Sequence, residues 1–210
     1  MTTEYNLEEI EAFDRDYTDR FAMKKGWEEH HLTDPIEDLQ LFFDNIPGKL
    51  MLDSGCGWGR YIHRFIDAEL EYVGIDHSRE MLLVAEASNP VLKFVQGTLR
   101  KISFPSDHFD GIWSCCSLAA VPKKHLVEIL SEHKRVLKRE GIITIVMPAF
   151  DKYGSGEEMY TDDDGNPEIY QAHYHLDELC KHIEDTGFKI INADYRWHNG
   201  SMYVLAKKPN

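Results

Sequence analysis

A glycine-rich segment follows the first strongly apolar stretch of strand length and offers the clearest opportunity for chemistry. It runs Leu52-Asp53-Ser54-Gly55-Cys56-Gly57-Trp58-Gly59-Arg60, so an apolar strand ends in an acid, a turn follows and a helix begins. Such a turn aims backbone N–H groups and a helix N-terminus at the carboxyl edge of a sheet, where open α/β sheets bind ligands. Glycine serves where the backbone needs a positive φ or must approach a ligand closely. The segment therefore predicts a ligand-binding turn.

The spacing of these glycines argues against two phosphate-binding motifs. The dinucleotide fingerprint places its third glycine three residues after the second, but that position is Arg60, and Gly59 comes two residues after Gly57. No lysine and hydroxyl pair follows the turn, which removes the nucleoside-triphosphate loop. A nucleotide-dependent enzyme on a similar sheet stays as a disfavoured alternative.

A second acid ends the next expected strand, Tyr72-Val73-Gly74-Ile75-Asp76, 17 residues beyond Gly59. A carboxylate at this place can accept hydrogen bonds from both hydroxyls of a ribose. Both acids also have a structural interpretation, because Asp53 could cap the turn and Asp76 could cap the helix that begins near Ser78. The turn and Asp76 together describe an adenosine site without a phosphate clamp.

The elements that must position these residues alternate between strand and helix. Strands are expected at 49–53, 72–75, 91–95, 109–114 and 142–147, and helices at 59–67, 78–87 and 122–138. Parallel strands need crossover connections, so this alternation predicts a parallel sheet covered on both faces. Strands at 188–195 and 201–207 are too close in sequence for a crossover and must form a hairpin. The predicted fold is α/β, a doubly wound seven-stranded mixed sheet with five parallel strands and a C-terminal antiparallel hairpin.

Two further stretches flank this sheet within what we expect to be a single domain, 1–210. Residues 1–46 are predicted to form an N-terminal helical cap in two pieces, with Phe13, Tyr17 and Phe21 on one face and Thr33-Asp34-Pro35 starting the second piece. Residues 148–175, ahead of a helix near 176–186, combine glycines, tyrosines and acids, which predicts a long substrate-side loop. A solvated acidic loop is the alternative.

Composition narrows the partners and the location. The chain carries 23 basic and 37 acidic residues, and its formal charge of −14 repels phosphate backbones and anionic lipid, which disfavours nucleic acid. No apolar run approaches the roughly 20 residues that span a bilayer, and the acidic N-terminus does not resemble a targeting peptide, so we expect a cytoplasmic protein. Cysteines at 56, 115, 116 and 180 show no paired framework, which predicts reduced thiols.

These features resemble the class I (seven-stranded) S-adenosylmethionine-dependent methyltransferases, especially those that act on small molecules. The resemblance covers residues 47–207. It rests on four segments in family order: LDSGCGWGR, YVGIDHSREML, FVQGTLRKISFPSDHFDGIWSCCSLAAVP and HLVEILSEHKRVLKREGIITIV. It implies S-adenosylmethionine as methyl donor and a small molecule as acceptor.

The resemblance also implies which residues bind the donor. The glycine turn would line its methionine half, Asp76 would hold the ribose, and His77 would lie beside the adenine. The full set that it implies is Tyr17, Asp53, Gly55, Cys56, Gly57, Gly59, Arg60, Asp76, His77, Thr98, Leu99, Ser114 and Cys115. Within this set, Thr98 and Leu99 would flank the adenine on its other side. Ser114 and Cys115 would begin the wall facing the transferred methyl.

Two positions depart from the family pattern. The family commonly has an acid after the glycine of the third-strand loop, where this chain has Thr98, and often a histidine before the next valine-proline pair, where this chain has Ala120. A histidine base is therefore not expected at position 120. A non-catalytic donor-binding relative that acts as a partner-binding protein stays as an alternative.

Methyl transfer from a sulfonium is a direct displacement, which depends on alignment and exclusion of water and needs no covalent protein intermediate. A base matters only for a protonated amine, a hydroxyl or a thiol, and the candidates by position are His173, His175 and Glu157. The two histidines could chelate a metal, but no third ligand stands at an obvious spacing, so no metal site is predicted. Cys115 and Cys116 are either small buried residues or nucleophiles.

Overall fold

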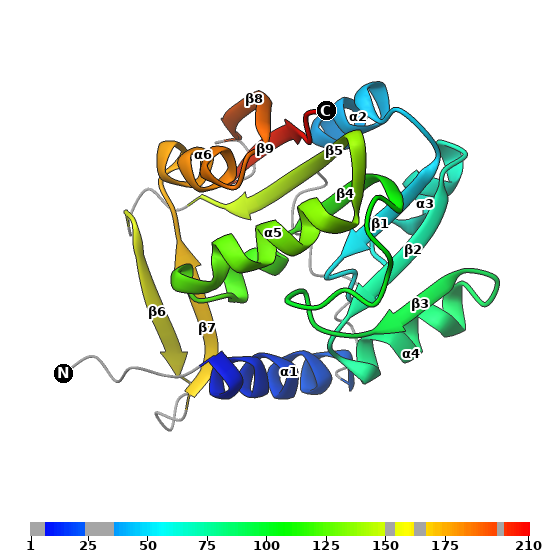
Figure 1. The fold of residues 1–210 in the computed structure, drawn as a ribbon. Helices are drawn as coiled ribbons and strands as arrows, with labels where there is room; N and C mark the ends of the chain where they lie inside the picture. The colour runs from blue at the N-terminus through cyan, green and yellow to red at the C-terminus, as the bar shows by residue number, and fades with distance from the viewer. Residues whose placement is uncertain (1–6, 24–35, 150–153, 162–166, 197–199) are drawn as a thin grey trace.

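A seven-stranded sheet forms the centre of the computed structural model, which describes residues 7–23, 36–149, 154–161, 167–196 and 200–210. Its strands are β1 (Leu50–Ser54), β2 (Glu71–Asp76), β3 (Lys93–Gln96), β4 (Phe109–Cys115), β5 (Leu137–Pro148), β8 (Lys189–Arg196) and β9 (Ser201–Lys207). They lie in the order β3-β2-β1-β4-β5-β9-β8 (Figure 1). Strands β1 to β5 pair in parallel, whereas β9 is antiparallel to both β5 and β8. The predicted mixed sheet with a terminal hairpin is confirmed.

The helices lie in the segments where the sequence predicted them, both in the N-terminal stretch and between the strands. They are α1 (Leu7–Met23), α2 (Ile36–Asn45), α3 (Ile62–Asp67), α4 (Arg79–Ser88), α5 (Leu126–Val136) and α6 (Leu176–Asp185), with short 3-10 turns η2 (Ser117–Ala120) and η3 (Lys123–His125). The proposed start of the second N-terminal helix, Thr33-Asp34-Pro35, and the side chains of Phe13 and Phe21 lie outside the described residues. None of the helices in the described part of the chain is long and apolar enough to cross a membrane.

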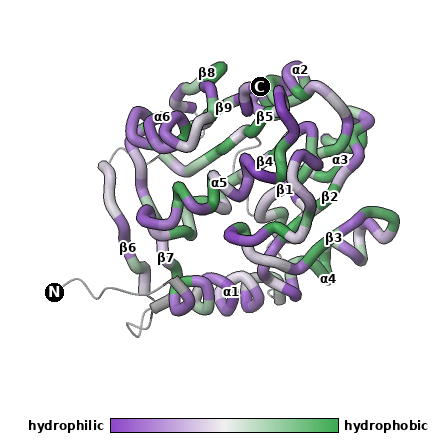
Figure 2. Tube along the Cα trace, viewed as in Figure 1, coloured by the Kyte–Doolittle hydropathy of each residue, from purple (hydrophilic) through white to green (hydrophobic). Residues whose placement is uncertain are grey.

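Two apolar clusters cover the two faces of the sheet, because alternate residues of each strand point to opposite faces. Along β4, Ile112 belongs to one cluster and Trp113 to the other. Trp113 is fully buried and meets Phe42 and Phe65 edge to face, an arrangement whose loss on truncation to alanine typically costs about 3–5 kcal/mol. Figure 2 shows hydrophobic residues along the central strands, whereas α1 is mostly hydrophilic.

Helix α1 lies across the carboxyl ends of the strands instead of covering a face of the sheet (Figure 1). It packs against β7 (Pro167–His173) and α4. An N-terminal helix in this position can close the edge of the sheet where the glycine turn ends.

The segment expected as a long loop, residues 148–175, contains a second sheet, so that prediction was wrong in its secondary structure. Strands β6 (Gly156–Thr161) and β7 pair antiparallel, with Glu157 opposite Ala172. Tyr170, Ala172 and His173 of β7 and the following Tyr174 are buried, although the sequence of the segment is largely polar. The segment is therefore a β-hairpin that adds to the apolar core beside α1 and η2.

Candidate functional site

Three glycines of the turn between β1 and α3 adopt positive φ, but they serve different purposes. Gly55, Gly57 and Gly59 have φ of +77°, +52° and +81°. A Cβ at Gly55 would lie 2.2 Å from the Cβ of Ser117, and one at Gly59 would lie 2.3 Å from the Cδ1 of Ile62. A Cβ at Gly57 would meet no atom within 4 Å. Gly57 is therefore the glycine of the turn that leaves room for a ligand.

The acid that ends β1 is buried beneath this turn. Asp53 is 4% exposed and accepts a hydrogen bond of 2.8 Å from the hydroxyl of Tyr72. Burial raises the pKa of Asp53 to about 7, although the Tyr72 hydrogen bond works in the opposite direction, and the charge of Asp76 raises it further. A cation placed beside this carboxyl would stabilise its ionised form.

Asp76 ties the turn to the helix that follows β2. One carboxylate oxygen accepts from the backbone N–H of Gly57 at 2.8 Å and the other from that of Ser78 at 2.9 Å. Burial raises the pKa of Asp76, against the charge of His77 and these two hydrogen bonds. Ser78 itself is the N-cap of α4, since its hydroxyl accepts from the N–H of Met81. Each oxygen of Asp76 retains acceptor capacity for a further donor such as a ribose hydroxyl.

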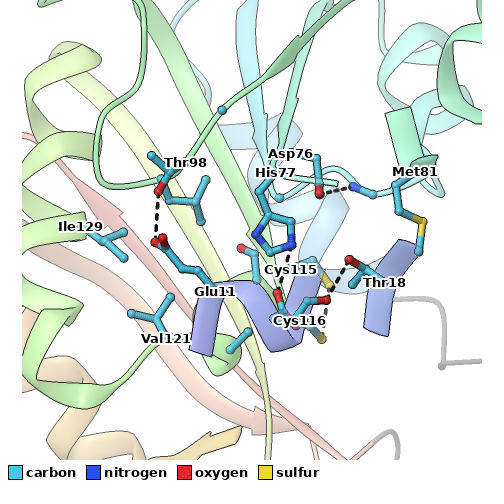
Figure 3. A pocket seen from close by; sticks show the side chains of 17 residues that line it. Glu11, Thr18, Asp76, His77, Met81, Thr98, Cys115, Cys116, Val121 and Ile129 are labelled. Carbon is cyan, nitrogen blue, oxygen red and sulfur yellow. Dashed lines mark hydrogen bonds and ion pairs between the residues drawn. The ribbon is translucent and has the colours of Figure 1, made fainter. Parts of the chain in front are cut away.

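Two adjoining cavities meet at the turn, and Figure 3 shows the larger one, of about 250 Å³. Its lining comprises Glu11, Asp14, Thr18, Gly55, Gly57, Asp76, His77, Met81, Gly97, Thr98, Leu99, Cys115, Cys116, Ser117, Ala120, Val121 and Ile129. The smaller cavity, of about 110 Å³, is lined by Asp53, Gly55, Cys56, Gly57, Trp58, Arg60, Tyr61, Cys115 and Cys116. Because Gly55, Gly57, Cys115 and Cys116 line both, the two cavities form parts of one site.

Most residues expected at the donor site line these cavities. They are Asp53, Gly55, Cys56, Gly57, Arg60, Asp76, His77, Thr98, Leu99 and Cys115. Tyr17, Gly59 and Ser114 line neither cavity. Tyr17 is half-buried on α1, and Gly59 packs on α3.

Ser114 belongs to a buried polar network behind the turn. Its hydroxyl lies 2.8 Å from that of Ser117, which donates to the carbonyl of Ser54 at 2.8 Å. The hydroxyl of Ser54 in turn lies 2.7 Å from Nε2 of the fully buried His133 on α5. Burial lowers the pKa of His133, against its contact with the carbonyl of Ile129, so a neutral ring anchors the network. These bonds fix the backbone immediately before Gly55.

Helix α1 contributes lining residues that sequence analysis did not identify, namely Glu11, Asp14 and Thr18. The carboxylate of Glu11 accepts two hydrogen bonds of 2.9 Å from the guanidinium of Arg100. It also accepts a hydrogen bond from the hydroxyl of Thr98 (Figure 3). Positions 11, 14 and 18 follow helical spacing and share a face, which was a usable signal. The sequence of α1 alone does not indicate which face meets the sheet.

A second ion pair holds the middle of α1 over the site. Oδ2 of Asp14 lies 3.2 Å from Nε2 of His77. Burial lowers the pKa of His77, but the hydrogen bond and charge of Asp14, together with Asp76, outweigh this and raise it. The hydroxyl of Ser78 also donates to Asp19. Polar contacts thus fasten α1 to the ends of β2 and β3.

Comparison with known proteins finds methyltransferases among the relatives of this chain. A family model described as a methyltransferase domain matches residues 51–141, which include the turn and both acids. A demethylmenaquinone methyltransferase of Renibacterium salmoninarum is 28% identical over 181 residues, covering 76% of this chain and 74% of that protein. YqeM of Bacillus subtilis, provisionally named a methyltransferase, is 33% identical over 158 residues, 69% of this chain and 61% of its own length. Residues 51–141 thus match a methyltransferase domain, and the chain has the fold of the class I S-adenosylmethionine-dependent methyltransferases.

Solved structures show that the whole chain has the methyltransferase fold. The 1,6-didemethyltoxoflavin-N1-methyltransferase of Burkholderia thailandensis, solved with 1,6-didemethyltoxoflavin and S-adenosylhomocysteine, has a TM-score of 0.78 at 16% identity. The match covers 100% of this chain and 93% of that one. The chain therefore shares its fold with S-adenosylmethionine-dependent methyltransferases, and a nucleotide-dependent enzyme on a similar sheet is not favoured.

The three candidate bases of the methyltransferase lie outside both cavities. Glu157 accepts from the backbone N–H of Lys123 at 2.8 Å and from the hydroxyl of Tyr170. His175 is exposed and caps the N-terminus of α6. His173 is buried on β7, where burial lowers its pKa and its Nε2 lies 3.8 Å from Glu158. The β6-β7 hairpin carries Glu157 and His173 and the start of α6 carries His175, and these contacts join them to residues that line neither cavity.

Proposed function

We propose that this methyltransferase transfers the methyl group of S-adenosylmethionine to a small, neutral, largely apolar acceptor. The observation that carries the proposal is the pair of adjoining cavities. The smaller is lined by an acidic and a basic side chain, and the larger has apolar side chains on one side. Together the two cavities suit the donor, which would extend through both, and the acceptor, which would lie in the larger one.

The smaller cavity suits the methionine half of the donor. Asp53 and Arg60 line the same space, and an α-amino acid group carries the two opposite charges that such a pair attracts. The ammonium would favour the ionised form of Asp53 and so offset the cost of burying that carboxylate. Gly57 leaves the backbone open to close approach where the two cavities meet.

The larger cavity suits the adenosine half together with an acceptor. Asp76 and His77 line one side of it and Val121 and Ile129 lie on the other (Figure 3), where Leu99 adds to the apolar lining. The acids that α1 adds are compensated, Glu11 by Arg100 and Asp14 by His77, so the lining shows little preference for a charged acceptor.

When bound, the donor supplies an electrophilic methyl group on a sulfonium, which a nucleophilic atom of the acceptor takes directly. The protein's contribution is alignment and a dry environment. Helix α1 covers the site, while the β6-β7 hairpin packs against α1 and η2. Two of the matched proteins are themselves named for small-molecule acceptors, demethylmenaquinone and 1,6-didemethyltoxoflavin. Their names support a ring compound as the first class to try.

The test is a turnover screen that measures release of S-adenosylhomocysteine. The acceptor panel comprises hydroquinones, phenols, nitrogen heteroaromatics, aliphatic amines and carboxylates. We expect turnover with neutral ring compounds and its loss in Gly57→Ala. Gly200→Ala is the matched control, because Gly200 also has a positive φ, +64°, and open space, but lies in the β8-β9 connection. Donor binding without transfer to any panel member would contradict the proposal and favour the non-catalytic alternative.

A further inference from the structure

Two adjacent thiols stand where the two cavities join. Cys115 ends β4, Cys116 follows it, and both line the larger and the smaller cavity (Figure 3). Their sulfur atoms lie 4.0 Å apart. The methyl-transfer proposal does not use either thiol.

The backbone of Cys116 explains how consecutive residues reach the same space. Neighbouring side chains of a strand normally point to opposite faces. Cys116 leaves that pattern with φ 62° and ψ −10°, a left-handed conformation that costs a residue other than glycine about 1–2 kcal/mol. Its N–H donates to the carbonyl of Val146 at 2.8 Å, which holds this conformation. Non-glycine residues retained in such conformations cluster at functional sites.

The surroundings make the two thiols unequal. A hydrogen bond from the Cys115 thiol lowers the pKa of Cys116, against burial, and the charge of Arg60 lowers it further. The pKa of Cys115 is raised by the same contact and by burial. The thiol of Cys115 also lies 3.9 Å from the hydroxyl oxygen of Tyr61. Cys116 therefore supplies the more reactive sulfur, with a protonated thiol beside it.

We propose that Cys115 and Cys116 form a chelating dithiol site for a trivalent arsenical, a thiophilic electrophile with two exchangeable oxygen ligands. Each thiol replaces one hydroxyl on arsenic, so two As–O and two S–H bonds break, two As–S bonds form and two water molecules leave. Arsenic stays trivalent, and no oxidant is required.

The separation of the sulfurs suits a bridging atom better than a disulfide. If each sulfur bonds to one central atom at about 2.3 Å, as in zinc thiolates, and the S–atom–S angle is bent, the two sulfurs lie roughly 3.4–3.8 Å apart. This separation is close to the observed 4.0 Å. A disulfide needs about 2.0 Å and Cα atoms at least about 4.4 Å apart, whereas consecutive Cα atoms lie about 3.8 Å apart. Zinc would need further ligands, and the described residues contain no group of three or more His, Cys, Asp and Glu suited to a metal.

The experiment treats the reduced, full-length protein with phenylarsine oxide and measures intact mass. We expect one phenylarsenic group per chain, which survives excess 2-mercaptoethanol and is removed by 2,3-dimercaptopropanol. Cys115→Ser and Cys116→Ser should each lose the adduct that resists the monothiol. Cys180→Ser is the matched control, because Cys180 lies on α6 outside both cavities, and it should keep the adduct. Circular dichroism checks that each variant folds.

An adduct that persists in both serine variants, or one that the monothiol removes from the unaltered protein, would overturn the proposal. A second arm adds S-adenosylmethionine before the arsenical and rests on the proposed function. Protection is expected, since the dithiol lies at the junction that the donor would occupy. If the dithiol adduct forms equally fast with the donor present, the dithiol site stands and the proposed position of the donor is wrong.

Discussion

The buried carboxyl of Asp53 gives the protein a stability that depends on pH in a predictable direction. Its pKa is raised from 3.8 to about 7, a cost of ionisation of about 4 kcal/mol at 1.36 kcal/mol per unit. An acid whose pKa is raised by folding stabilises the protein while it is protonated, so this stability falls as pH rises from about 4 to 7. Between pH 5.5 and pH 8, Asp53 alone should remove about 2 kcal/mol from the free energy of unfolding.

The substitution Asp53→Asn removes this titration but retains an oxygen that can accept from Tyr72. Urea unfolding at pH 5.5 and pH 8 measures the difference in the free energy of unfolding between the two conditions for each protein. Asp76, whose pKa is also raised, titrates in both proteins, so the comparison isolates the titration of Asp53 together with its repulsion by Asp76. We expect the pH-dependent loss to be about 2 kcal/mol smaller in Asp53→Asn. Equal losses in the two proteins would refute the argument that burial raises the pKa of Asp53.

Three further predictions concern the turn and α1. Gly57→Ala should lower the free energy of unfolding by about 1–2 kcal/mol and abolish donor binding measured by calorimetry. Gly59→Ala should destabilise the protein further, because the new Cβ would lie 2.3 Å from the side chain of Ile62, and equal unfolding midpoints of the two variants would contradict this. Asp76→Ala should weaken donor binding by roughly ten-fold to a hundred-fold. If the mutation weakens binding of a 2′,3′-dideoxy analogue of the donor as much as binding of the donor itself, Asp76 has only a structural role. Asp14→Asn should lower the pKa of His77 in an NMR titration, and an unchanged pKa would show that the ion pair is not formed in solution.

The sequence predicted the sheet and its turn because both depend on local signals. Strand and helix patterns alternate along the chain, and the short connection before Ser201 forces a hairpin whatever the rest of the fold does. Positions such as Glu11 and Asp14 depend instead on where α1 docks, and that is decided by contacts with Arg100 and His77 far away in the sequence. The surroundings of the candidate bases, which line neither cavity, also depend on contacts between distant parts of the chain. The acidic composition around Glu157 suggested a loop, whereas the segment forms a hairpin whose opposite strand buries Tyr170 and Ala172 in the core.

The position of β9 has a consequence for how the chain folds as it is synthesised. This strand is synthesised after the other six strands of the sheet, yet it lies between β5 and β8, and Met202, Val204 and Ala206 are fully buried there. Until it emerges, β5 presents an unpaired edge along a strongly apolar strand, which is the kind of surface that invites pairing with other chains. The cavities around the glycine turn, built from β1, β2 and β4, can form earlier. The nascent protein would then hold much of its binding site while its sheet is still open.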